Sequence, residues 1–260
     1  MILCIDIGNT NIKLGVFENN SLVASFRISS VQSKTSDEYG IAIINLINSA
    51  DIKKEDLTGV IISSVIPSLN YTIEHMCSYY LKLKPIIVGS GTKTGLNLKV
   101  DNPREVGADR IVNSIAALKK YGGPIIVIDF GTATTFNAVT ENNELIGGVI
   151  APGIKGSLDS LVTGTAKLPR VEIVTPKSVL GKNTITNMQA GIVFGFAGMV
   201  EFIVKKMKEE LGGGNIKVIA TGGFSEIISK EASCIDAVDK KLTLDGLKIL
   251  YELNQAEVKE

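Results

Sequence analysis

The sequence predicts an α/β protein built from two similar halves. Stretches rich in branched apolar residues alternate with stretches whose apolar residues recur at helical spacing, which is typical of the α/β class. A β-branched run that ends in Asp-x-Gly occurs twice, at residues 3–10 and 125–132. We therefore predict two duplicated domains, residues 1–120 and 121–260, that face each other across a cleft.

The order of elements in the first half follows from periodicity and stop signals. The predicted strands are residues 2–7, 21–28, 59–65 and 84–88. The predicted helices are residues 35–48, 67–81 and 108–120. A Gly-Gly-Pro sequence at residues 122–124 ends the last helix and places the boundary between the halves near Tyr121. At the end of the chain, residues 244–254 predict a terminal helix whose partner the sequence does not identify.

Composition excludes one class of partner. The chain has 260 residues, 45% of them apolar, which is enough to bury one large or two modest cores. Its 27 Lys and Arg residues balance 27 Asp and Glu residues, and no run of five basic residues occurs. Proteins that bind nucleic acid concentrate positive charge on one surface. We therefore expect no nucleic-acid partner.

Cysteine spacing and hydropathy favour a cytoplasmic protein. Cys4, Cys77 and Cys234 are too widely separated for a zinc motif and too few for a disulfide framework. Asp6 interrupts the apolar start, so we expect no signal peptide. The longest apolar run, residues 190–200, has 11 residues, whereas a membrane-spanning helix needs about 20. We therefore expect no membrane segment.

The first Asp-x-Gly motif, residues 6–11, has the groups that a polyphosphate requires. A buried strand brings the Asp6 carboxylate to its carboxyl end, and Gly8 allows the backbone to approach a ligand. Asn9, Thr10 and Asn11 add hydrogen-bond donors, and the carboxylate can reach Mg²⁺ directly or through water. The alternative is a hairpin turn whose polar side chains satisfy its own backbone groups.

A second copy of this motif, residues 129–135, strengthens the interpretation as a nucleotide site. Two such turns can hold one nucleotide between them, and neither the P-loop nor the Gly-x-Gly-x-x-Gly motif occurs. A third glycine-rich turn, at residues 218–224, follows a predicted strand and precedes a helix that begins near Ser225. Its flat backbone suits a purine, although an ordinary connection from strand to helix has the same pattern.

Asp109 and Arg110, at the start of a predicted helix, are the most suggestive acid and base pair. The single histidine, His75, has no companion residues for catalysis, so a carboxylate is the natural general base. Asp109 could accept a hydroxyl proton while Arg110 binds an anionic group of the substrate. The alternative is a helix-terminal aspartate that stabilises the helix dipole beside a surface arginine.

Two further glycine-rich stretches have structural interpretations. Residues 147–153 predict a sharp chain reversal, with a cleft or hinge position as the alternative. Gly191, Gly195 and Gly198 fall inside a predicted apolar helix, where each glycine costs about 1 kcal/mol relative to alanine. Close approach of another helix explains such a cost. We expect a domain or subunit contact there, or else packing in the core.

Six motifs in this order resemble the type III pantothenate kinases along essentially the whole chain. They are residues 6–11, 102–110, 129–135, 147–153, 181–184 and 220–223. The resemblance implies two ribonuclease-H-like domains of the superfamily that contains acetate and sugar kinases, heat-shock 70 proteins and actin. It also implies ATP-dependent phosphorylation of pantothenate to 4′-phosphopantothenate, the first step of coenzyme A biosynthesis. Another small-molecule kinase of this superfamily, or a nucleotide-binding regulator without turnover, is the alternative.

The resemblance also implies a set of site residues. Those implied to contact the ATP phosphates are Asp6, Ile7, Gly8, Asn9, Thr10, Asn11, Ile12, Lys13 and Thr132. Asp6 would lie near Mg²⁺, Gly222 and Gly223 beside the adenosine, and Asp129 on a monovalent cation, K⁺ or NH₄⁺. Those implied to bind pantothenate are Val100, Gly107, Ala108, Asp109, Arg110 and Thr184, with Asp109 as proton acceptor. A homodimer is also implied, in which Thr184 can act from the partner subunit.

Two positions depart from the family pattern. Val100 stands where many members carry an aromatic residue at the substrate pocket, and Asn137 stands where an acidic residue is frequent. The first departure concerns the shape of the pantothenate pocket, and the second concerns cation coordination near the second hairpin. Neither position has a predicted catalytic role.

Overall fold

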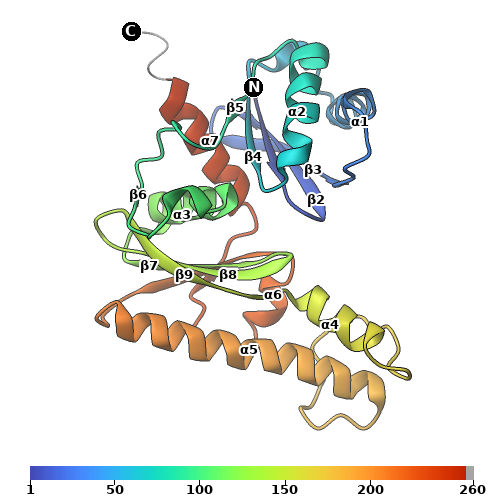
Figure 1. The fold of residues 1–260 in the computed structure, drawn as a ribbon, viewed down its shortest axis with the longest axis vertical. Coiled ribbons are helices and arrows are strands. Elements are labelled where there is room, and N and C mark those ends of the chain that lie inside the picture. The colour runs from blue at the N-terminus through green and yellow to red at the C-terminus, as the bar shows by residue number, and fades with distance from the viewer. Residues whose placement is uncertain (256–260) are drawn as a thin grey trace. The chain divides into compact units, whose positions relative to one another are not determined.

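The structure, a computed structural model that describes residues 1–255, is a mixed α/β fold with two sheets (Figure 1). The chain divides into two compact units. Among the described residues, unit 1 contains Met1–Gly95, Asn102–Ala116 and residues 243–255, and unit 2 contains Leu96–Asp101 and Ala117–Leu242. The predicted α/β class is confirmed. The domain boundaries at residues 1–120 and 121–260 stay a prediction.

The sheet of unit 1 has five strands in the order β3-β2-β1-β4-β5. They are β1 (Ile2–Ile7), β2 (Asn11–Glu18), β3 (Ser21–Ser29), β4 (Gly59–Ser64) and β5 (Ile86–Ile87). The first three are antiparallel neighbours, and β4 joins β1 in parallel. The central position of β1 follows from its apolar sequence, because a strand with neighbours on both sides and covered faces must be apolar throughout.

Two helices cover one face of this sheet, and they lie next to each other in Figure 1. The first, α1 (Ser36–Asn48), begins with a capping box, in which Thr35 and Glu38 each bind the other's backbone N–H. The second, α2 (Pro67–Met76), begins with proline at its first turn and continues as a π-helical turn, Cys77–Leu81. Short 3₁₀ turns occupy Lys54–Asp56 and Pro103–Glu105. The predicted helices and strands of the first half are confirmed within two residues at each end.

The other face of the sheet of unit 1 packs against the last helix, α7 (Leu242–Gln255). A Cβ atom on Gly15 of β2 would lie 2.9 Å from the Leu244 side chain, and one on Gly59 of β4 would overlap the Tyr251 ring. These two positions therefore need glycine so that the helix can approach the sheet closely. The terminal helix is confirmed, and the structure identifies its partner as the sheet of the first half.

The sheet of unit 2 has six strands in the order β11-β10-β7-β8-β9-β6. They are β6 (Asn97–Leu98), β7 (Ile125–Phe130), β8 (Ala133–Val139), β9 (Glu144–Pro152), β10 (Lys217–Gly222) and β11 (Ala237–Val238). Here too an apolar central strand, β7, has an antiparallel hairpin partner on one side and a parallel strand on the other. The same strand pattern thus surrounds each Asp-x-Gly motif.

The predicted chain reversal at residues 147–153 is wrong. Residues 147–152 belong to β9, and Gly153 directly follows this strand. Gly147 has φ +155° at an irregularity in the pairing of β9 with β8, where the register shifts between Ala138 and Val139. The chain reverses earlier, at residues 140–143. Glycine allows a strand irregularity as readily as a turn, so composition could not separate the two.

Three further helices belong to unit 2. They are α4 (Ile154–Thr163), α5 (Thr184–Glu210) and α6 (Ser225–Ile228), and α5 runs along one face of the sheet in Figure 1. By length and composition α5 is the one helix in residues 1–255 that could cross a membrane. Its residues Ile192, Phe196 and Val200 pack instead in the core of unit 2, and a core helix passes the same test. The length of α5 therefore gives little support for a membrane span.

The three glycines of α5 do not face the core. Gly191, Gly195 and Gly198 are exposed, and no described atom beyond the helix lies within 4 Å of where their Cβ atoms would be. Packing in the core is thus excluded as the reason for glycine at these positions. The expected subunit contact remains as a proposal, to which we return below.

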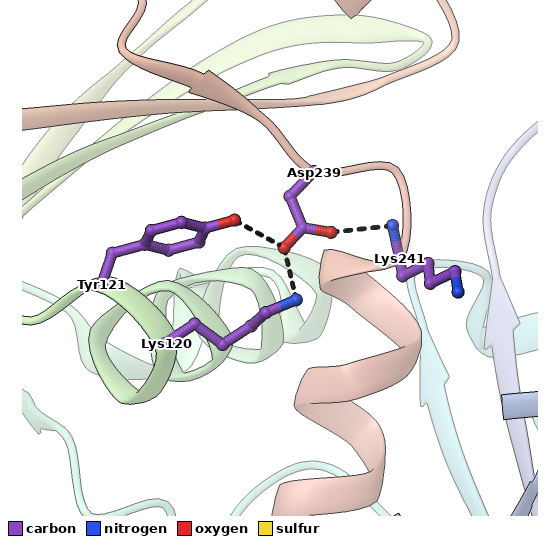
Figure 2. A network of polar contacts seen from close by, with 4 residues as sticks. All are labelled: Lys120, Tyr121, Asp239 and Lys241. Atoms are coloured by element: carbon purple, nitrogen blue, oxygen red, sulfur yellow. Dashed lines mark hydrogen bonds and ion pairs between the residues drawn. The ribbon is translucent and has the colours of Figure 1, made fainter. Parts of the chain in front are cut away.

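A buried carboxylate fixes the end of α3 (Ala108–Tyr121), as Figure 2 shows. Lys120 Nζ lies 2.5 Å from Asp239 Oδ2, and the Tyr121 hydroxyl donates to the same oxygen at 3.0 Å. The other oxygen accepts from the Lys241 backbone N–H at 3.0 Å. Asp239 is 8% exposed, so these contacts stabilise a charge that water reaches poorly. The network ties the end of α3 to the residues between β11 and α7.

We expect Asp239→Asn to lower the free energy of unfolding by about 1–3 kcal/mol, because it removes the carboxylate that pairs with Lys120 at 2.5 Å. Lys120 is one-third exposed, which keeps the loss below that of a fully buried pair. Urea denaturation followed by circular dichroism measures the change. The matched control is Glu226→Gln, which removes the exposed pair between Lys240 and Glu226 and should cost below about 0.5 kcal/mol. Equal losses in the two variants would contradict a stabilising role for the network.

Candidate functional site

The first Asp-x-Gly motif forms the turn of the β1–β2 hairpin. The Gly8 N–H donates to the Asn11 carbonyl at 3.0 Å and closes the turn. Ser30, directly after β3, anchors it from the side, since its hydroxyl donates to the Gly8 carbonyl at 2.5 Å and its N–H to the Thr10 carbonyl at 3.1 Å. Asn9 and Thr10 are exposed at the tip. The turn is therefore held by its backbone while its polar side chains reach solvent.

Asp6 lies just before this turn and is only 6% exposed. Its carboxylate is 3.5 Å from the Lys13 ammonium, which stands opposite it on β2. On its other side Asp6 pairs in parallel register with Ser63 of β4. A carboxylate that is removed from water requires a counter-charge, and Lys13 supplies it. The pair can reorganise around a cation and a phosphate, because each partner suits one of them.

The start of α3 lies at the same edge of the sheet of unit 1. The Val65 N–H, directly after β4, donates to the Ile7 carbonyl at 3.0 Å, which places Val65 at the carboxyl ends of β1 and β4. A Cβ on Gly107 would lie 3.9 Å from Val65 Cγ1 and 2.5 Å from Asp109 Oδ1. The edge of the sheet that carries Asp6 therefore also receives Asp109.

Arg110 is more buried than the surface arginine of the alternative interpretation, whereas Asp109 makes a contact that this interpretation also allows. The Asp109 carboxylate accepts from the Arg110 backbone N–H at 2.8 Å, as an aspartate in the first helical turn can. Arg110 is half-buried, and this burial lowers the pKa of its guanidinium, while the charge of Asp109 acts in the opposite direction. A guanidinium stays protonated at neutral pH even so. Its planar donors suit a carboxylate or a phosphate.

Unit 2 brings two of the predicted motifs together. The second Asp-x-Gly motif forms the β7–β8 hairpin, whose turn closes where the Gly131 N–H donates to the Ala133 carbonyl at 3.1 Å. Gly222 ends β10 with φ +93°, which favours glycine, and a Cβ there would lie 2.6 Å from Asp129 Oδ1. The Asp129 carboxylate therefore lies directly against the Gly222–Gly223 turn.

The two units repeat one arrangement of side chains across three strands. In register, the rows are Lys13, Asp6 and Ser63 in unit 1, and Thr135, Asp129 and Thr221 in unit 2. Each aspartate has a hairpin residue on one side and a hydroxyl residue of a parallel strand on the other. The duplication inferred from the two sequence motifs thus extends to their neighbours.

A family model described as type III pantothenate kinase matches residues 2–206. The chain belongs to the type III pantothenate kinase family. The match includes both hairpins, the start of α3 and most of α5, so the family resemblance of the motifs is confirmed.

Solved structures with low sequence identity share the fold of this family member. A Baf family transcriptional activator from Campylobacter jejuni is 18% identical with a TM-score of 0.61, over 98% of this chain and 99% of that chain. Component A of (R)-2-hydroxyglutaryl-CoA dehydratase from Acidaminococcus fermentans is 16% identical with a TM-score of 0.59, over 98% of each chain. An inorganic polyphosphate/ATP-glucomannokinase from Arthrobacter sp. strain KM is 14% identical with a TM-score of 0.52, over 97% of this chain and 98% of that chain. The fold is therefore that of the actin-like ATPases and sugar kinases.

Family membership makes the protein a kinase and implies ATP and Mg²⁺, and the residues present fit this ion. In residues 1–255 no three His, Cys, Asp or Glu side chains gather into a metal site. Kinases hold Mg²⁺ with one or two carboxylates, while the phosphates and water supply the other oxygens. The Asp6 carboxylate, near the carboxyl end of β1, offers an oxygen ligand of this kind.

The other predicted substrate residues of the kinase lie on several elements. Ala108 opens α3, whereas Val100 follows β6 and is half-buried. Thr184 is the exposed first residue of α5, which Asn183 caps by accepting from the Thr186 backbone N–H at 2.9 Å. Asn137, the second departure from the family pattern, is fully buried on β8. The predicted cleft between the two halves stays a prediction.

Two residues beside the motifs, Ser30 and Ser63, were not identified from the sequence. Single serines at strand ends are too common to carry a signal. Gly153 and Thr221 lie inside motifs that the sequence does identify, but neither has a predicted site role, and the motif with Gly153 was assigned to a reversal. A Cβ at Gly153 would lie 1.9 Å from the Thr132 carbonyl oxygen, so the chain after β9 passes directly over the turn of the second hairpin.

We expect Gly153→Ala to destabilise unit 2 by about 2 kcal/mol or more, because the added methyl group meets rigid backbone. Gly156, in the helix that follows, serves as the control, because a Cβ there would meet no atom of the described residues within 4 Å. Gly156→Ala should stabilise the protein by up to about 1 kcal/mol. Thermal unfolding compares the two variants. A Gly153→Ala protein as stable as the wild type would contradict the close approach to Thr132.

Proposed function

We propose that the protein transfers the γ-phosphoryl group of ATP to the primary hydroxyl of pantothenate and forms 4′-phosphopantothenate. The observation that carries the proposal is the common position of Asp6 and Asp109 at one edge of the sheet of unit 1. One carboxylate suits a metal-bound nucleotide, and the other suits the hydroxyl that attacks it. Family membership supports pantothenate as the acceptor.

In this proposal the hairpin turns bind the nucleotide. Residues 6–13 and Thr132 bind the phosphates, and Gly222 and Gly223 lie beside the adenosine. Lys13 turns from Asp6 toward a phosphate, which leaves Asp6 to face Mg²⁺. When bound, Mg²⁺ neutralises charge on the phosphates. Asp129 binds K⁺ or NH₄⁺, supported by its position against the Gly222–Gly223 turn, where backbone carbonyls are close.

The start of α3 binds and activates pantothenate. Arg110 pairs with the pantothenate carboxylate, and Asp109 accepts the proton of the attacking hydroxyl. Because phosphoryl transfer passes through a loose transition state, proton removal comes late and alignment contributes most of the rate. Val100, Gly107, Ala108 and Thr184 complete the pocket.

A homodimer is part of the proposal, and the outer face of α5 supports it. Apolar side chains at the start of this helix and before it are exposed, among them Val179, Leu180 and Ile185. Val179 and Leu180 line an open groove together with Gly191 and Gly195. Large apolar patches on a protein surface often mark interfaces. Thr184 lies in this region, which is consistent with its predicted action on the partner subunit's substrate. We also propose a cytoplasmic location.

The decisive experiment is ATP consumption with pantothenate, compared with a panel of sugars and short carboxylic acids. We expect ATP turnover with pantothenate and with none of the other acceptors. We also expect more turnover with K⁺ than with Na⁺ as the only monovalent cation. Turnover with a panel compound in its place would identify another kinase of the superfamily. Nucleotide binding without turnover on any acceptor would favour a regulatory protein.

We expect Asp109→Asn to lower kcat by about 10²-fold or more with little change in the affinity for ATP, because an amide cannot accept the proton. Steady-state kinetics with each substrate varied in turn separates the two effects. Glu105→Gln is the control, since Glu105 is an exposed carboxylate four residues earlier that contacts Asn102. Unchanged turnover in Asp109→Asn would remove Asp109 from the role of base.

A further inference from the structure

The row of Lys13, Asp6 and Ser63 contains one group that the proposed function does not use. Residues paired directly across neighbouring strands direct their side chains to the same face of a sheet. The Asp6 carboxylate therefore has the Lys13 ammonium on one side and the Ser63 hydroxyl on the other. Lys13 is 3.5 Å away and forms an ion pair.

The Ser63 hydroxyl is buried without a hydrogen bond. Ser63 is 0% exposed, and its Oγ has no partner within residues 1–255. The next residue, Ser64, differs, because its Oγ accepts from the Ile66 N–H at 3.1 Å. A buried polar group without a partner lowers stability, and alanine would avoid that cost. Such groups in native proteins require an explanation, and function is one.

The proposed movement of Lys13 supplies this explanation. Asp6 is 6% exposed in the free protein, and it loses the counter-charge that β2 provides when the Lys13 ammonium turns to a phosphate. Each hydrogen-bond donor that reaches a carboxylate with so little water around it then stabilises the charge. Ser63 is the next side chain in the row, and a serine hydroxyl can rotate to donate to an adjacent oxygen.

Unit 2 repeats the hydroxyl in the same position. Thr221 of β10 pairs in parallel register with Asp129, as Ser63 of β4 pairs with Asp6. Thr221 is also buried, with 2% of its surface exposed. A buried hydroxyl residue thus stands beside the aspartate on the parallel strand in both halves of the molecule.

We propose that Ser63 is a positioning residue for Asp6, whose hydroxyl donates to the Asp6 carboxylate in the nucleotide complex and orients it toward Mg²⁺. The inference rests on the proposed function only for the nucleotide and its metal ion and does not depend on the acceptor. It predicts that the hydroxyl costs stability in the free protein and contributes affinity in the complex. A serine that only fills space would show the cost in stability without the contribution to affinity, so the second effect decides.

The test measures ADP binding by isothermal titration calorimetry, with and without Mg²⁺, together with thermal unfolding. For Ser63→Ala we expect an unfolding midpoint at or above that of the wild type. We expect about tenfold weaker binding of ADP with Mg²⁺ and little change without it, because a hydrogen bond to a charged group is lost only in the metal complex. Ser63→Thr keeps the hydroxyl and should retain most of the preference for Mg²⁺.

The control is Cys4→Ala, on the same face of β1 and equally buried. This variant should lower the unfolding midpoint and leave the Mg²⁺ preference unchanged. A Ser63→Ala protein that keeps the full preference would overturn the proposal, as would a Ser63→Thr protein that loses it. A wild type that binds ADP equally with and without Mg²⁺ would overturn it as well. If the wild type prefers Mg²⁺ but does not phosphorylate pantothenate, the proposed function fails while the role of Ser63 stands.

Discussion

The removal of one carboxylate from water, almost fully for Asp6 and partly for Asp129, at the end of a central strand is the constraint on which both units depend. A charge in that position is tolerated only where neighbouring groups replace water. In unit 1 the neighbours of Asp6 are a lysine across the hairpin and a serine on the parallel strand. In unit 2 the neighbours of Asp129 are two threonines in register and the backbone of a tight glycine turn. The sheet order, with a hairpin on one side of the strand and a parallel strand on the other, is what supplies these neighbours.

The same constraint explains the glycines near each aspartate. Gly8 and Gly131 each lie two residues after an aspartate and close the hairpin turns with backbone hydrogen bonds. Gly222 and Gly153 lie where a second segment passes over the second hairpin, and a side chain at either position would overlap atoms already there. Short turns and close backbone contacts leave peptide N–H groups near a negative charge. This is the arrangement that a polyphosphate and its metal ion require.

Local signals predicted much of the fold. The predicted helix at residues 35–48 begins with a capping box of Thr35 and Glu38, Pro67 begins the next helix, and the Gly-Gly-Pro sequence ends α3, where Gly122 has φ +78°. Each of these features depends on residues close together in the chain. The path of residues 147–153 was misassigned because glycine fits a turn and an irregular strand equally well.

Long-range partners could not be predicted in the same way. Asp239 binds Lys120 and Tyr121 across more than a hundred residues, and the sequence marks none of the three as a partner. Ser63 acquires its meaning only from the register that places it beside Asp6. The resemblance to type III pantothenate kinases identified the motifs that matter. It did not identify neighbours of the motifs such as Ser63, because such contacts depend on how the strands are paired.

The position of α7 has a consequence for the synthesis of the protein. Leu247 and Leu250 of this helix are fully buried, and Leu244 and Tyr251 fill the space above two glycines of the first sheet. The sheet that is translated first therefore lacks the cover for one of its faces until the last helix leaves the ribosome. Domains usually fold in the order of their translation. Here the amino-terminal half must wait for the carboxyl terminus, so a chain truncated before α7 exposes an apolar sheet to aggregation.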